Sequence, residues 1–181
     1  MGTEKILYCT LAMFRRENDQ QKSEILLGLK RKDRLFGGYW NGFGGKVEAG
    51  DELIPKMIEE CEDECGLTPT EWVHHGTLHF RFRDEPYHAI CELFEVHAFN
   101  GTCVGDSREF ERFQWFDKQK LVRDLSPPAA LPILPADQFW LRELLEKGIV
   151  HREFLYDNRK DLNLLAPAVI PSYYLGPRRA R

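Results

Sequence analysis

The chain has 181 residues, a length typical of a single domain with its own hydrophobic core. Its composition, 43% hydrophobic and 30% charged, is that of a globular protein, and no apolar run reaches the ~18 residues of a membrane-spanning helix. The net charge of -4 disfavours a surface that follows nucleic-acid phosphates, so we expect a small ligand and no DNA, RNA or membrane partner.

The N-terminal part of the chain is predicted to form a hairpin, a loop and a helix. Residues 6–14 and 25–30 are rich in β-forming side chains, and the polar stretch between them predicts an antiparallel pair of strands. Residues 32–45 are rich in glycine and are expected to form a loop. A helix is expected over residues 52–65.

Further strands and two more helices are predicted in the rest of the chain. The expected strands are residues 79–83, 88–99, 111–116 and 150–156. The expected helices are residues 117–124 and 138–147, the second with Asp137 as its N-cap and Gly148 as its stop. The four prolines of residues 126–137 predict an irregular segment between these helices.

This order of elements predicts the α/β class, either as an α+β domain or as a layered α/β/α domain. We place the domain at residues 1–157 and expect residues 158–181 to form a C-terminal extension, irregular or partly so. No signal-peptide pattern opens the sequence, and the odd number of cysteines contains no CxxC pair. We therefore expect reduced thiols, a cytoplasmic location, and neither a zinc knuckle nor a disulfide framework.

The helix predicted at residues 52–65 is apolar on one side and acidic on the others. Its apolar side chains recur at four-residue steps at Leu53, Met57, Cys61 and Cys65, which predicts that this stripe faces a core. Asp51 is a plausible N-cap, and Gly66 is a plausible C-terminal stop.

The C-terminal end of this helix carries five carboxylates, at Glu59, Glu60, Glu62, Asp63 and Glu64. Like charges four residues apart cost roughly 0.2–0.5 kcal/mol per pair, and acids at a helix C-terminus also oppose the helix dipole. A solvated acidic face is one interpretation. The other is a Mg²⁺ site, since Glu60, Asp63 and Glu64 share one side and Mg²⁺ prefers a few carboxylates together with substrate phosphates.

The glycines before the helix support the second interpretation, because a residue without Cβ lets the backbone approach a ligand closely. Gly45, five residues, Asp51, seven residues and then the stretch from Glu59 to Leu67 resemble the Nudix box, GX5EX7REUXEEXGU. The flanking WNGFGGKV is similar to the MutT-like, oxidised-purine nucleoside triphosphate diphosphatases of eukaryotes.

The resemblance implies a Nudix α/β/α sandwich with a mixed β-sheet that hydrolyses nucleoside diphosphate derivatives, often a triphosphate to a monophosphate and pyrophosphate. It implies Mg²⁺, with Mn²⁺ as an alternative. The implied metal ligands are the carboxylates of Glu60, Asp63, Glu64 and Glu109 and the carbonyl of Gly44. Glu60, Glu64 and Glu109 are also the implied catalytic residues, Glu109 as a ligand or a base. Alternatively, Glu109 is an exposed carboxylate in a loop with no role in the site.

Two positions depart from the box. Glu59 stands where the family has an arginine that pairs with box carboxylates, and Asp51 stands where the family has glutamate. Either Lys46, Lys56 or a strand arginine, Arg81 or Arg83, balances the site instead, or the enzyme is weakened or inactive.

The resemblance also implies residues that bind the substrate. Asn41 corresponds to the family's base-binding asparagine, or it is a turn residue. The family's Trp-Pro-Asp-Asp segment reads Leu134-Pro135-Ala136-Asp137, so the stacking ring and one acid are missing. Asp137 is kept, either as an acid that binds the edge of the base or as no more than the cap of the following helix. Four further residues are candidates for the nucleotide pocket, although each has an equally simple structural role: Thr10, Lys30, Phe36 and Trp140.

The leading hypothesis is a Mg²⁺-dependent nucleotide pyrophosphohydrolase acting on purine nucleoside triphosphates, including oxidised ones. The alternatives are hydrolysis of another nucleoside diphosphate derivative, such as a dinucleoside polyphosphate, a nucleotide sugar or an RNA cap, and a non-catalytic Nudix module that binds a nucleotide or a protein. The sequence is compatible with a monomer or a homodimer.

Overall fold

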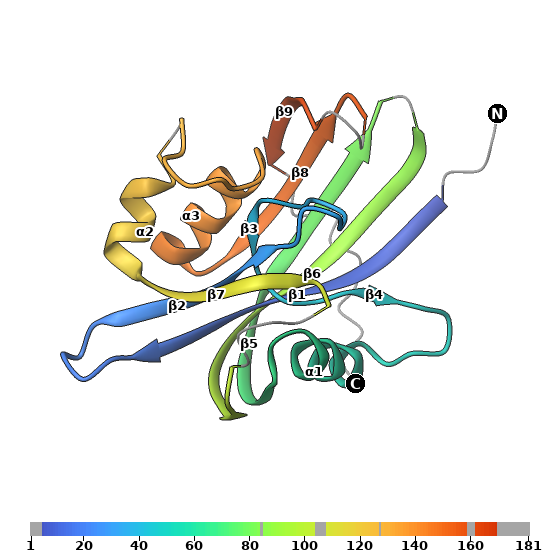
Figure 1. Ribbon diagram of the computed structural model, residues 1–181. Helices are drawn as coiled ribbons and strands as arrows, with labels where there is room; N and C mark the ends of the chain where they lie inside the picture. The colour runs from blue at the N-terminus through green and yellow to red at the C-terminus, as the bar shows by residue number, and fades with distance from the viewer. Residues whose placement is uncertain (1–4, 84, 104–107, 127, 159–161, 170–181) are drawn as a thin grey trace.

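The computed structural model describes residues 5–83, 85–103, 108–126, 128–158 and 162–169. In the described part of the chain, nine strands form one mixed sheet with helices on both of its faces (Figure 1). The main path of the sheet runs β3-β2-β1-β6-β5-β8-β9, while β4 pairs with β1 and β7 with β2. The predicted α/β/α sandwich with a mixed sheet is confirmed.

The strands are β1 Lys5–Glu17, β2 Ser23–Lys30, β3 Trp40–Asn41, β4 Lys46–Val47, β5 Leu67–Phe82, β6 Glu85–Gly101, β7 Phe110–Asp117, β8 Val150–Tyr156 and β9 Leu164–Val169. The helices are α1 Leu53–Cys65, α2 Lys118–Asp124 and α3 Asp137–Lys147. β1 and β2 form the predicted antiparallel hairpin, whereas β1 runs parallel to β6 and β5 runs parallel to β8.

The two faces of the sheet bury two separate cores. On the central strands β1 and β6, neighbouring residues alternate between faces, so both faces can be apolar. Met13 and Leu93 face the core beneath α2 and α3, while Phe14 and Phe94 face the core beneath α1. This explains why the two strands read as nearly continuous apolar runs.

Helix α1 begins and ends close to the predicted positions. Gly66 ends it with a left-handed backbone, φ 75°, and Gly148 ends α3 in the same way, φ 84°. The N-caps differ from the prediction. Glu52, without a side-chain cap bond, precedes α1, and the carboxylate of Asp51 instead accepts a hydrogen bond from the backbone N–H of Glu48.

The prediction of Asp137 as an N-cap was also wrong. Ala136 is the N-cap of α3, and Asp137 is the first residue inside the helix. The carboxylate of Asp137 is buried, and it accepts a hydrogen bond from the side chain of Trp140 in place of a backbone N–H at the start of the helix.

The largest differences from the predicted strands are at β5, which is much longer than expected, and at β9, which was not expected. We predicted a strand at residues 79–83, but β5 begins at Leu67, directly after α1. Register shifts at Pro69–Glu71 and His74–Gly76 interrupt the alternation of side chains that identifies a strand in a sequence. Residues 164–169, predicted to be irregular, form β9 at the edge of the sheet.

No helix in the described residues is both long and apolar enough to cross a membrane.

Candidate active site

The glycine-rich loop lies directly on β1. The N–H of Thr10 donates to the carbonyl of Gly45, N···O 2.9 Å, and Ala12 and Phe43 exchange two backbone hydrogen bonds. A Cβ at Gly44, whose φ is 150°, would collide with the Thr10 carbonyl, and a Cβ at Gly45 would collide with the carboxylate of Glu60. Glycine is therefore required at Gly44, where the obstacle is backbone, whereas a Cβ at Gly45 would displace the side chain of Glu60.

Glu64 joins helix α1 to this loop. Its side chain is buried, and its Oε2 accepts a hydrogen bond of 2.8 Å from the N–H of Gly44. The contact places a carboxylate of α1 against the backbone of the glycine-rich loop, and a carboxylate oxygen is a ligand suited to a hard cation.

The environment of Glu64 shifts its protonation. Burial raises the pKa of Glu64 to about 7, opposed by the positive charge of Lys30 and by the Gly44 N–H, and reinforced by the negative charges of Glu60 and Glu109. An added cation at this point would favour the ionised form, because opposite charges lower the pKa of a carboxyl group.

Lys56 provides the charge partner for the acidic end of α1. Its Nζ lies 2.9 Å from Oε1 of Glu60 and 3.1 Å from Oε2 of Glu59. Hydrogen bonds to Glu60, and then to Glu59, raise the pKa of Lys56 above its ordinary value. Among the cations considered as replacements for the missing arginine, Lys56 is the one whose contact with these acids is observed, while Arg81 lies 3.4 Å from Glu153.

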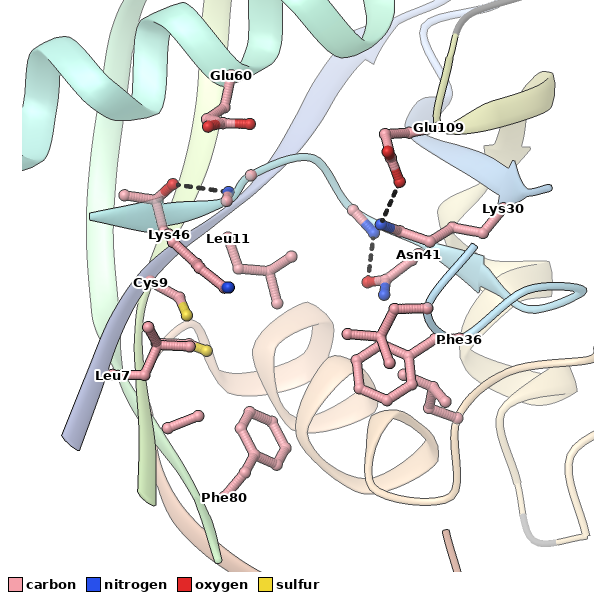
Figure 2. A pocket seen from close by; sticks show the side chains of 18 of the residues that line it. Leu7, Cys9, Leu11, Lys30, Phe36, Asn41, Lys46, Glu60, Phe80 and Glu109 are labelled. Atoms are coloured by element: carbon pink, nitrogen blue, oxygen red, sulfur yellow. Dashed lines mark hydrogen bonds and ion pairs between the residues drawn. The ribbon is translucent and has the colours of Figure 1, made fainter. Parts of the chain in front are cut away.

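Glu109 faces the α1 carboxylates from another part of the sheet. It lies just before β7, and its carboxylate is 3.6 Å from Nζ of Lys30 and 3.7 Å from Nε of Arg34. Figure 2 shows the carboxylates of Glu60 and Glu109 on either side of the glycine loop. Acids from two places in the sequence, α1 and the residue before β7, therefore converge at one end of a cavity.

This cavity has a volume of about 570 Å³, within the usual range for small-molecule sites. The acidic end is formed by α1, the glycine loop and Glu109, and the other end is lined by apolar side chains that include Phe36, Phe80 and Leu134. Such a division suits a molecule with a charged, metal-binding end and a flat apolar end.

Asp137 is buried at the apolar end, with 4% of its surface exposed. Its Oδ1 accepts a hydrogen bond of 2.7 Å from the indole N–H of Trp140. Burial raises the pKa of Asp137 to about 7, although the Trp140 N–H opposes the shift. Below about pH 7 the carboxyl group is therefore neutral and has a proton to donate to a ligand.

The structure brings most of the predicted site residues together around this cavity. Those that line it are Thr10, Lys30, Phe36, Asn41, Gly44, Glu60, Glu64, Glu109 and Asp137. The Asn41 side-chain oxygen accepts a hydrogen bond of 2.8 Å from the N–H of Gly42, so the residue also shapes the turn.

Two predicted residues lie outside the cavity lining. Asp63 is exposed on α1 and does not line the cavity. Trp140 is 1% exposed in the core beneath α3, where its N–H holds Asp137. Its contribution to the site is therefore to orient another residue.

The sequence did not predict the aromatic wall of the cavity, formed by Phe80, Phe82, Tyr87 and Tyr156. The alternation in HFRFR placed Phe80 and Phe82 on one face of a strand. The alternation shows only that this face is apolar. It does not show that α3 leaves part of the face uncovered, and that uncovered part lines the cavity.

Comparison with known proteins identifies the family. The family model described as the NUDIX domain matches residues 10–136. This chain belongs to the Nudix family. It is similar to the oxidized purine nucleoside triphosphate hydrolases of Mus musculus, with 36% identity over 70% of this chain and 75% of the relative, and of Danio rerio, with 33% identity over 80% and 78%.

The fold agrees with this assignment. A crystal structure of a MutT protein from Bacillus halodurans superposes with a TM-score of 0.72 at 21% identity, covering 90% of this chain and 96% of that one. More distant relatives have other Nudix activities in their names, among them an ADP-ribose pyrophosphatase and an NAD-capped RNA hydrolase. The chain is a MutT-like Nudix hydrolase, and this family uses divalent metal ions and acts on small nucleotide substrates.

The residues present fit a divalent ion. Glu64 is a carboxylate whose pKa burial raises to about 7, so a cation beside it would offset the cost of burying its charge, and Glu60 lies against Gly45, where a Cβ would displace its carboxylate. Carboxylate and carbonyl oxygens are the ligands that Mg²⁺ prefers.

The raised pKa of Asp137 predicts a pH-dependent stability that its isosteric amide should lack. Below pH 3.8 the carboxyl is neutral in both states, and between 3.8 and about 7 it ionises only in the unfolded state. The free energy of unfolding of the wild type should therefore fall relative to Asp137→Asn as pH rises through this window, by up to about 1.4 kcal/mol per pH unit. Denaturant unfolding at several pH values, with chelator present, measures this.

Glu64 is present in both proteins, so its titration contributes equally to both free energies of unfolding and cancels in their difference. Parallel stability curves across the window would show that Asp137 is ionised in the folded protein.

Proposed function

We propose that this Nudix hydrolase is a Mg²⁺-dependent nucleotide pyrophosphohydrolase that converts purine nucleoside triphosphates, including oxidised ones, to monophosphate and pyrophosphate. The observation that carries the proposal is the division of one cavity into an acidic end, with Glu60, Glu64 and Glu109, and an apolar end, with Asp137 and Asn41. The similarity to oxidized purine nucleoside triphosphate hydrolases supports the substrate class.

The proposed metal ligands are the carboxylates of Glu60, Glu64 and Glu109 and the carbonyl of Gly44, without the exposed Asp63. When bound, Mg²⁺ supplies positive charge where the phosphate oxygens become more negative in the transition state. The Gly44 N–H fixes the orientation of Glu64, and Lys30, whose side chain is 15% exposed, lies where it can contact a phosphate. A water molecule attacks phosphorus, the bond to the leaving pyrophosphate breaks, and Glu109 accepts the proton.

At the other end of the cavity the protein holds the base. Asp137 in its neutral form donates a hydrogen bond to an acceptor on the edge of the base, and Phe36 and Leu134 provide apolar surface. Leu134 offers no ring for stacking, which is worth roughly 1–3 kcal/mol per base, so we expect weaker selection among bases than in relatives with a tryptophan there.

The absence of a stacking ring at Leu134 also favours a second candidate function within the family. This is hydrolysis of another nucleoside diphosphate derivative, such as a dinucleoside polyphosphate, a nucleotide sugar or an RNA cap. The phosphate end of the cavity serves these substrates equally well. Chromatography of the products from canonical and oxidised triphosphates, dinucleoside polyphosphates, ADP-ribose and a capped RNA separates the two candidates.

Replacing Glu64 by glutamine should abolish turnover without unfolding the protein. The variant keeps the size of the side chain but loses the charge, so kcat for the preferred nucleotide should fall about 10²-fold or more. Steady-state kinetics with Mg²⁺ measures this, and thermal unfolding checks the fold. Glu52→Gln, on the exposed N-cap of the same helix, is the matched control and should retain full activity.

The proposal would be wrong if purified wild-type protein released neither phosphate nor pyrophosphate from any nucleotide in the panel with Mg²⁺. Binding of a nucleotide without turnover and without metal dependence would indicate the non-catalytic module instead.

We further propose that Lys56 takes the role of the arginine that Glu59 replaces, which is why we expect the enzyme to be active. Lys56→Met leaves Glu60 without its partner, so the affinity for Mn²⁺ and kcat/KM should fall roughly 10–100-fold, as for other residues that orient metal ligands. Mn²⁺ titration by electron paramagnetic resonance, together with kinetics, measures both.

Two variants make this test specific. Lys147→Met breaks a similar exposed pair, with Nζ of Lys147 3.5 Å from Glu143, and should change neither quantity. Adding Glu59→Arg to Lys56→Met supplies the arginine of the family pattern and should recover metal affinity. Equal metal affinity in Lys56→Met and the wild type would contradict the proposed role.

A further inference from the structure

A second group of metal-binding side chains lies on β5 and β6. His75, Glu95 and His97 each place a ligand atom within 4.8 Å of the ligand atoms of the other two. Glu95 and His97 are two residues apart on β6 and therefore share a face of the sheet. His75 joins them from the register shift between His74 and Gly76 on the neighbouring strand.

This group is separate from the Nudix site. None of its three residues lines the cavity described above. In the parallel pairing of β1 and β6, Cys91 at the cavity lies opposite Cys9, whereas Glu95 lies opposite Met13. Four residues along a strand correspond to about 13 Å, so the two sites occupy different stretches of the same strands.

Two features of the group call for a cation. The Glu95 side chain is 7% exposed, and its Oε1 lies 3.4 Å from Nη1 of Arg15 and 3.5 Å from Nε2 of His97, both longer than a strong charge-assisted hydrogen bond. Nε2 of His75 is buried and has no hydrogen-bond partner among the described residues. A buried ring nitrogen without a partner costs free energy, which a bond to a metal ion would recover.

We propose that His75, Glu95 and His97 bind a transition-metal ion of the Zn²⁺ type. Two imidazoles and one carboxylate, with water as a fourth ligand, form an established donor set for Zn²⁺. The same donor set disfavours Mg²⁺, since Mg²⁺ prefers oxygen ligands and two of the three donors are imidazole nitrogens.

The geometry requires one adjustment. Tetrahedral Zn²⁺ with bonds of 2.0–2.1 Å holds its ligand atoms roughly 3.3 Å apart, so the side chains must close from 4.8 Å. His97 is exposed and can rotate toward the other two, whereas Glu95 is fixed by burial. The bound ion would link His75, at the register shift of β5, to Glu95 and His97 on β6. It would therefore stabilise the folded state, and more so at higher metal concentration.

The full chain, freed of metal, is titrated with Zn²⁺ in competition with a chromogenic chelator. The titration is done in excess Mg²⁺, which fills the Nudix site, about one pH unit above the ordinary histidine pKa. The wild type should bind one Zn²⁺ per chain, and His97→Asn should bind it at least about tenfold more weakly. His97 is exposed, so this variant should fold, and thermal unfolding with and without Zn²⁺ should show a shift that only the wild type displays.

Two controls separate this site from others. His74→Asn removes the neighbouring histidine, whose Nε2 contacts Glu92 at 2.6 Å, and should leave Zn²⁺ affinity unchanged. Glu64→Gln alters the Nudix site and should also leave it unchanged, so failure of the proposed hydrolase activity would not affect this test. The inference is overturned if no stoichiometric Zn²⁺ binding occurs in Mg²⁺, or if His97→Asn binds as tightly as the wild type.

Discussion

The site depends on the hydrogen bond between the Gly44 N–H and the carboxylate of Glu64, which holds the acidic end of α1 against β1. Burying an acid costs free energy unless its charge is satisfied, and the helix dipole adds to the cost at this end. Gly44 and Gly45 make the contact feasible because any Cβ there would strike Thr10 or Glu60. The glycine loop, the helix register and the position of the metal-binding oxygens thus follow from one close approach of backbone to carboxylate.

Charge balance at this helix shows how a family pattern can change without loss of its physical purpose. The family places an arginine directly before the box glutamate that corresponds to Glu60, and in this chain Glu59 stands in its place. Lys56 lies one helical turn before Glu60 and reaches the same carboxylate, since residues four apart are neighbours on a helix. A lysine offers a point charge and no planar fork, so it neutralises Glu60 but fixes its orientation less strictly than an arginine would.

Local signals made much of this molecule predictable. The apolar stripe of α1, its stop at Gly66 and the β1–β2 hairpin follow from patterns within single segments, while Glu60, Glu64 and Glu109 were chosen from the family resemblance. Contacts between segments did not follow from local patterns. Bulges hid the first half of β5, Asp137 is buried beside the cavity and does not cap α3, and Trp140, a candidate for either the pocket or the core, lies in the core behind Asp137. The choice of Lys56 among several cations also required the observed 2.9 Å contact with Glu60.

Glu64 and Asp137 lie in one cavity, and burial raises the pKa of each to about 7, yet their surroundings assign them opposite roles. Glu64 faces Lys30 and a backbone N–H, so a cation added beside it favours the carboxylate. Asp137 is buried among apolar neighbours, whose effect on its pKa outweighs that of the Trp140 N–H, so a flat base that excludes water would favour its neutral form. Near neutral pH, a nucleotide that fills the whole cavity, together with its metal ion, would therefore shift the two pKa values in opposite directions. Glu64 would become an ionised metal ligand, and Asp137 a neutral hydrogen-bond donor. A complete nucleotide would then fix the protonation state of both carboxyl groups, whereas a phosphate or a base alone would fix the state of only one of them.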